Sequence, residues 1–140
     1  MPLDPERALQ AALLARLRAE PLLQPVLGAA PRVYDEPPPD PVHPFVTVGR
    51  SHSQPWGGGS EAEAEGTEHV VTLTCVSRYG GAEEAKAVAG LVRATLHGAA
   101  LSLTDHALVN LRVSYVDVFR ASDWRSTYGV VRLRAVTEPL

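Results

Sequence analysis

The sequence has a single cysteine, Cys75, and a single lysine, Lys86. One cysteine cannot form an internal disulfide, and it offers no second thiolate for a cysteine-based metal site. No apolar run reaches the roughly 20 residues that span a bilayer. The segment that carries Asp4 and Glu6 has neither the basic nor the apolar region of a secretion signal. These absences predict a protein that is made and kept in a reducing bacterial cytoplasm, or in a particle assembled there, with no membrane partner.

The sequence also lacks a strong charge of either sign, because its formal net charge is −3. A nucleic-acid-binding module normally carries a clustered basic surface, so the charge argues against that class. An apolar fraction of 45% lies in the globular range. A chain of 140 residues has the length of one ordinary domain with a modest core. We therefore expect residues 1–140 to form a single domain.

Residue patterns of an active site are missing as well. His97, Ser102, Asp105 and His106 supply the residue types of a catalytic triad, but no nucleophile-elbow motif accompanies them. The five histidines show no paired spacing of the zinc type. The glycines at 57–59 are not followed by the Lys-Ser or Lys-Thr of a phosphate loop. We expect no catalytic, cofactor-binding or metal-binding residues.

Two helices are expected from what is present. Asp4 is a good N-cap, Pro5 suits the first helical position, and leucines recur every four residues from Leu9 until Pro21 discourages further helix. A second apolar stripe at helical spacing covers residues 85–96. It has two glutamates at its start and a histidine and a glycine at its end, as a helix prefers.

Strands are expected where apolar and polar residues alternate or β-branched residues gather. These segments are residues 32–35, 45–49, 69–76, 108–119 and 128–137, with a turn at 121–125. The predicted fold class is α+β, with two main helices packed on one face of a mostly antiparallel sheet of four to five strands.

Residues 51–66 form the least globular stretch of the sequence. Glycines at 57–59 supply backbone freedom, and Glu61, Glu63 and Glu65 alternate with small residues and repel one another. We expect a long, mobile, acidic hairpin loop here.

Five arginines fall on the last two predicted strands and their turn. The alternation predicts no interleaved aromatic residues on the same face, so these arginines would make only a modest phosphate-binding patch. Two interpretations stay open, a solvated sheet face and a charged protein–protein surface. If copies packed head to tail, the acidic loop of one subunit would meet the arginines of the next. The candidate subunit or tube interface comprises Trp56, Glu61, Glu63, Glu65, Arg112, Arg120, Trp124, Arg125, Arg132 and Arg134.

The order of these pieces resembles a known family. The segments that carry the resemblance are residues 5–13, 33–35, 44–49, 77–78, 84–98, 109–111, Asp123 and 128–135. Together they resemble the small tail-completion proteins of siphophage-like particles, which gene transfer agents also encode. The resemblance runs from about Pro5 to Glu138. It departs from many relatives at Val76, where they have tryptophan, which leaves the strand pattern intact.

The resemblance implies a structural tail terminator without enzymatic activity. Such proteins form a hexameric ring on the head-proximal end of the tail tube, stop its polymerisation and offer the attachment surface for the neck. The implied partners are further copies of the chain, the tail tube protein and a neck or stopper protein, with DNA passing through without specific binding. The implied location is the head–tail junction of a phage or phage-like particle. The alternative within this class is a neck stopper or head–tail connector ring.

Overall fold

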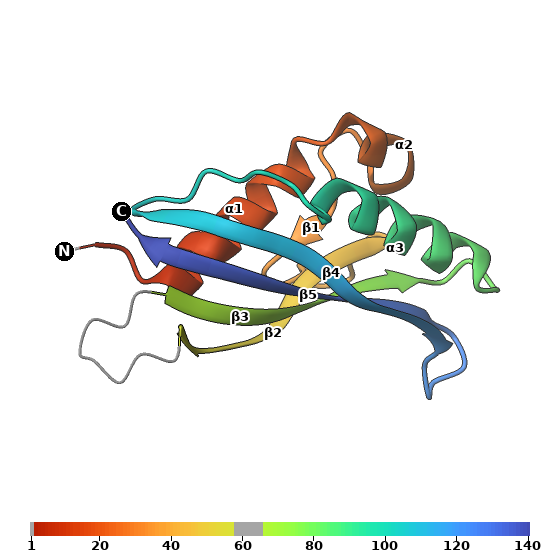
Figure 1. Cartoon of the computed structure of the whole chain (residues 1–140). Helices are drawn as coiled ribbons and strands as arrows, with labels where there is room; N and C mark the ends of the chain where they lie inside the picture. Colours follow the sequence, from red (N-terminus) through yellow and green to blue (C-terminus); the bar gives the residue numbers. More distant parts are fainter. Residues whose placement is uncertain (1, 58–65) are drawn as a thin grey trace.

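The computed structural model describes residues 2–57 and 66–140, which form an α+β fold with three helices and a five-stranded mixed sheet (Figure 1). The helices are α1 (Pro5–Arg18), α2 (Gln24–Leu27) and α3 (Glu83–Leu96), with a 3-10 turn, η1 (Pro21–Leu23), before α2. The strands are β1 (Val33–Tyr34), β2 (Phe45–Trp56), β3 (Gly66–Ser77), β4 (His106–Arg120) and β5 (Thr127–Pro139).

The strands lie in the order β1-β2-β3-β5-β4. β1 pairs parallel with β2 over two residues only, and all other neighbours are antiparallel. The predicted, mostly antiparallel sheet of four to five strands is therefore confirmed. At one end of the sheet, Thr127 of β5 is in register with Ser77 and Arg120; at the other end, Trp56 is in register with Gly66.

The two long helices begin and end as their sequences predict. The carboxylate of Asp4 accepts hydrogen bonds from the backbone N–H groups of Glu6 and Arg7, which are left without helical partners at the start of α1. α3 has its acidic residues in the first turn, and Gly98 follows its C-cap with a φ of 72°, a conformation that suits glycine.

A single hydrophobic cluster joins the helices to the sheet. It includes Leu9 and Leu13 of α1, Val88 of α3, Leu73 of β3 and Leu133 of β5, all nearly inaccessible to solvent. Along β3, alternate residues are buried and the residues between them are half-buried, as the period of two predicts. Burial of this apolar surface provides the main driving force for folding.

The predicted loop at 51–66 needs correction, because β2 continues to Trp56. Residues 51–56 pair with β3 in regular antiparallel register after a bulge that follows Val48. Every side chain from Arg50 to Trp56 is exposed, so this half of the strand has no apolar alternation to reveal it. Backbone pairing with β3 stabilises it instead. The remainder of the predicted loop, residues 58–65, lies outside the described residues.

None of the helices among the described residues combines the length and the apolar composition that a membrane span requires.

Candidate functional site

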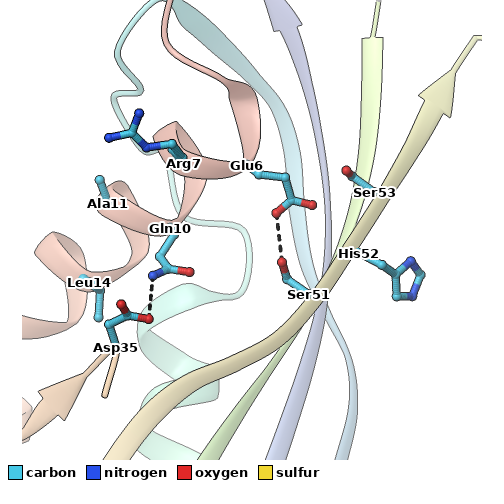
Figure 2. Close-up of a pocket in the computed structure, with 9 residues that line it drawn as sticks. All are labelled: Glu6, Arg7, Gln10, Ala11, Leu14, Asp35, Ser51, His52 and Ser53. Atoms are coloured by element: carbon cyan, nitrogen blue, oxygen red, sulfur yellow. Dashed lines mark hydrogen bonds between the residues drawn. The ribbon is translucent and has the colours of Figure 1, made fainter. Parts of the chain in front are cut away.

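An open groove of about 710 Å³ lies between α1 and the exposed half of β2. Figure 2 shows the side chains that line it, with Glu6 facing Ser51 and Gln10 facing Asp35. The Oε1 atom of Glu6 accepts a hydrogen bond of 2.9 Å from the Ser51 hydroxyl. The Oδ1 atom of Asp35 accepts one of 3.0 Å from the Gln10 amide. These bonds hold both carboxylates at the groove.

Part of the wall of the groove is apolar. Ala11 is exposed and Leu14 is half-buried, on the face of α1 that looks across to β2. Arg7 lines the groove as well, so the carboxylates of Glu6 and Asp35 stand beside one guanidinium. The groove therefore combines an apolar patch with a local excess of negative charge.

A second feature is the turn between β4 and β5, at the end of the sheet where Arg120 pairs with Thr127. The Oδ1 atom of Asp123 accepts hydrogen bonds from the backbone N–H groups of Arg125 (2.8 Å) and Ser126 (3.0 Å). These bonds hold the pKa of the Asp123 carboxyl below its usual range. The backbone also closes on itself, because Ala121 N–H donates to the Ser126 carbonyl at 2.8 Å. The predicted turn is thus a fixed structure.

This turn carries Trp124, whose side chain is 75% exposed. Its φ is 61°, which is in the left-handed region that bulky residues avoid. Arg120 donates a hydrogen bond of 3.1 Å to the Trp124 carbonyl, and its guanidinium lies 5.7 Å from the indole centroid. The side chain of Arg125 is exposed beside it. The turn therefore presents one aromatic ring together with two cations.

The other arginines of the hairpin lie farther along β4 and β5 from this turn. Arg132 stacks over Tyr115, with 5.0 Å from the guanidinium carbon to the ring centroid. Arg112 stands opposite Arg134 in the register of β4 and β5. The expectation that the five arginines lack aromatic neighbours is wrong for Arg132 and Arg120, because cross-strand pairing and the turn bring Tyr115 and Trp124 onto them.

Arg134 has a carboxylate partner, Glu68, whose negative charge offsets the positive charge of Arg112 on the neighbouring strand. Its Nε atom donates to the Oε2 atom of Glu68 on β3. Hydrogen bonds from Gln54 and Arg134 lower the pKa of Glu68. Gln54 belongs to the half of β2 that was predicted as loop, so this network was not foreseen.

Among the described residues of the predicted interface, the two tryptophans lie at opposite ends of the sheet. Trp56 is at the β2 end of the sheet, next to Gly66, and Trp124 is at the other end. Glu61, Glu63 and Glu65 lie outside the described residues. The predicted pairing of acidic loop and arginine hairpin therefore stays a prediction.

Comparison with known proteins shows where this architecture belongs. Residues 11–138 match the family model for tail completion protein gp17. The chain belongs to the tail completion protein gp17 family. This confirms the resemblance in the sequence and assigns the chain a structural role in a phage-like tail.

Two solved structures are similar to this tail completion family member. One is a chain in the virion of a native gene transfer agent particle, with 28% sequence identity, a TM-score of 0.82, and coverage of 95% of this chain and 96% of that one. Another, with 14% identity and a TM-score of 0.58, covers 99% of this chain and 97% of its own, and it shares the fold. No curated protein matches the sequence.

Three of the triad residue types in this tail completion protein, His97, Asp105 and His106, bind backbone groups. The Nδ1 atom of His97 accepts a hydrogen bond from Val113 N–H at 2.9 Å, where the end of α3 meets β4. The carboxylate of Asp105 and the imidazole of His106 bind the N–H and the carbonyl of Leu3. Among residues 2–57 and 66–140, no three His, Cys, Asp or Glu side chains are grouped as metal ligands would be.

Sequence reasoning missed the groove of this family member entirely. Gln10, Asp35 and Ser51 are separated by 16 residues or more in the chain, and nothing local connects them. The turn had a usable signal, because an aspartate in a Ser-Asp-Trp-Arg-Ser stretch often accepts from the backbone two residues later. That signal identifies the turn without identifying the conformation of Trp124.

Proposed function

We propose that the protein is a tail terminator of a phage or phage-like particle. Six copies form a ring on the head-proximal end of the tail tube, stop tube polymerisation and offer the attachment surface for the neck. The observation that carries this proposal is the family match over residues 11–138. The similarity to a chain of a gene transfer agent virion, across nearly the whole of both chains, supports it.

The physical demands of a ring support the proposal further. Each subunit needs distinct surfaces for its two neighbours, for the tube and for the neck. A stable contact buries about 800 Å² per partner, which is about a tenth of the 7954 Å² of accessible surface of the described chain. We propose that the whole chain acts as one domain, with both long helices on one face of the sheet and the other face available for partners.

The proposed partners are other copies of the chain, the tube protein and a neck or stopper protein. DNA passes through the ring without specific binding. The acidic residues Glu61, Glu63 and Glu65 either contact the arginines of the neighbouring subunit or face the channel, where they repel DNA. Replacement of all three by glutamine without loss of assembly would exclude the first role.

Electron microscopy of particles from a producing strain that lacks the gene tests the proposal. Overlong, irregular tubes alongside tailless, DNA-filled heads are expected. Tails of normal length that fail to join heads would indicate a neck stopper or connector instead, and the tube-stopping role would be rejected. Complementation with the intact gene controls for effects on neighbouring genes.

A further inference from the structure

The conformation of Trp124 is the feature that the tail role leaves unexplained. A left-handed φ is unfavourable for a bulky residue, and Trp124 is 75% exposed, so it buries little apolar surface within the subunit itself. The turn nevertheless fixes this conformation through Asp123 and Arg120. Strained residues that their surroundings hold in place cluster at functional sites, and tryptophan and arginine are enriched in the energetic centres of interfaces.

The groove between α1 and β2 has the complementary chemistry. It offers the carboxylates of Glu6 and Asp35 for cations, and Ala11 and Leu14 for an apolar ring. The turn offers Arg125 and the indole of Trp124. The volume of about 710 Å³ is in the range of pockets that enclose ligands, about 300–1,000 Å³.

The turn lies at one end of the sheet, whereas the groove lies about midway along it, on the β2 side. The turn follows Arg120, which pairs with Thr127 at the end of β5 that also meets Ser77. The groove lies at residues 51–53 of β2, toward the end where Trp56 pairs with Gly66. Figure 1 shows the β4–β5 turn projecting from the sheet, away from the N-terminal end of α1. One subunit therefore cannot fill its own groove with its own turn.

We propose that the β4–β5 turn of one copy docks into the groove between α1 and β2 of the next copy. Trp124 packs on Ala11 and Leu14, and Arg125 pairs with Asp35 of the neighbour. The contact is heterologous, since two different surfaces meet, and repeated contacts of this kind close into a ring when the rotation allows it. The inference rests on the proposed self-assembly and identifies the surfaces that produce it.

Cross-linking in assembled particles tests this geometry directly. The double variant A11C/S122C places one thiol in the groove and one on the turn. Cysteine at position 11 behaves as a small apolar residue and adds one sulfur atom to the proposed contact with Trp124. The native Cys75 is buried, so a flexible bis-maleimide should react only at the new sites. Covalent multimers of this chain are expected from the double variant and not from either single variant. The pair A94C/S122C, with a thiol on the exposed side of α3, is the matched control.

Assembled particles of A11C/S122C without multimers, or with no more than the A94C/S122C control gives, would overturn the proposal. So would a cross-link to the tube protein in place of a second copy. This readout is independent of tail length. Multimers together with tubes of normal length in the deletion strain would retain the docking contact and reject the terminator role.

A charge-reversal cycle covers the case in which cysteine variants do not assemble. Arg125→Asp and Asp35→Arg should each lower the yield of complete particles by about tenfold or more, as loss of a charged interfacial contact does. The double variant should recover most of that loss. Arg93→Asp, at an exposed position on α3, should have no effect. Single variants with the wild-type yield of complete particles would contradict the pairing of Arg125 with Asp35. A double variant whose yield stays as low as that of the single variants would also contradict it.

Discussion

The imidazole of His69 and the hydroxyl of Thr137 lie 2.9 Å apart, on the neighbouring strands β3 and β5. Both side chains are almost completely buried. The other ring nitrogen of His69, Nδ1, has no hydrogen-bond partner among the described residues and is 3.7 Å from the Glu6 carboxylate. Burial lowers the pKa of His69, and this effect outweighs the opposing attraction of Glu6.

This arrangement predicts a loss of stability in mild acid. Below the unfolded value of about 6.5, the unfolded chain binds a proton at His69 that the folded chain does not. The free energy of unfolding should therefore fall as the pH drops from 7.5 through 6 to 5.5. Burial also lowers the pKa of His43, which should make the free energy of unfolding fall more steeply as the pH drops. Urea denaturation at each pH measures it.

The variant His69→Gln should show a smaller decrease over the same pH interval than the wild type. His52→Gln, at an exposed position on β2, is the matched control and should keep the wild-type slope. An identical pH dependence in His69→Gln and the wild type would contradict the assignment.

The thiol of Cys75 should be inert in the folded protein. Burial raises its pKa to about 12, and only the thiolate reacts readily with disulfide reagents. An aromatic disulfide reagent at pH 8 should titrate no thiol in native buffer and one thiol per chain in denaturant. Rapid reaction in native buffer would show that the core around β3 opens easily.

The leucine core should dominate stability. Leu133 is fully buried in the hydrophobic cluster, so Leu133→Ala removes its packing and leaves a cavity. The expected loss is about 2–5 kcal/mol in the free energy of unfolding. Leu22→Ala is the control, because that side chain is 64% exposed and the expected change is within about 0.5 kcal/mol. Equal effects of the two substitutions would contradict the description of the core.

Substitution by alanine at two glycines should change the stability of the protein in opposite directions. A Cβ at Gly129 would lie 3.0 Å from the Ala85 carbonyl and 3.2 Å from Ala89, where α3 crosses β5. Gly129→Ala should cost about 1–3 kcal/mol through overpacking. A Cβ at Gly90, in the middle of α3, meets nothing within 4 Å. Gly90→Ala should stabilise the protein by about 0.5–1 kcal/mol. Thermal unfolding of both variants measures the difference.

Local features of the sequence determined the elements with a strong periodic pattern. Asp4 and Pro5 start α1 because capping involves only neighbouring residues, and its leucine stripe follows the helical period. The alternation along β3 and β5 likewise identified the buried sides of both strands. The arginine-rich hairpin was recognised from the same alternation. These signals are readable because each is fixed within a few residues of the chain.

Only the tertiary structure decided where these elements meet. Residues 51–56 are a strand because β3 supplies their hydrogen-bond partners. Their exposed, mostly polar side chains show no alternation that would predict this pairing. The groove exists because folding brings Gln10 to Asp35 and Glu6 to Ser51. Arg132 meets Tyr115 through the β4–β5 register, which a bulge in β4 shifts. Such contacts join distant parts of the chain, and no local propensity or periodicity encodes which distant residues become neighbours.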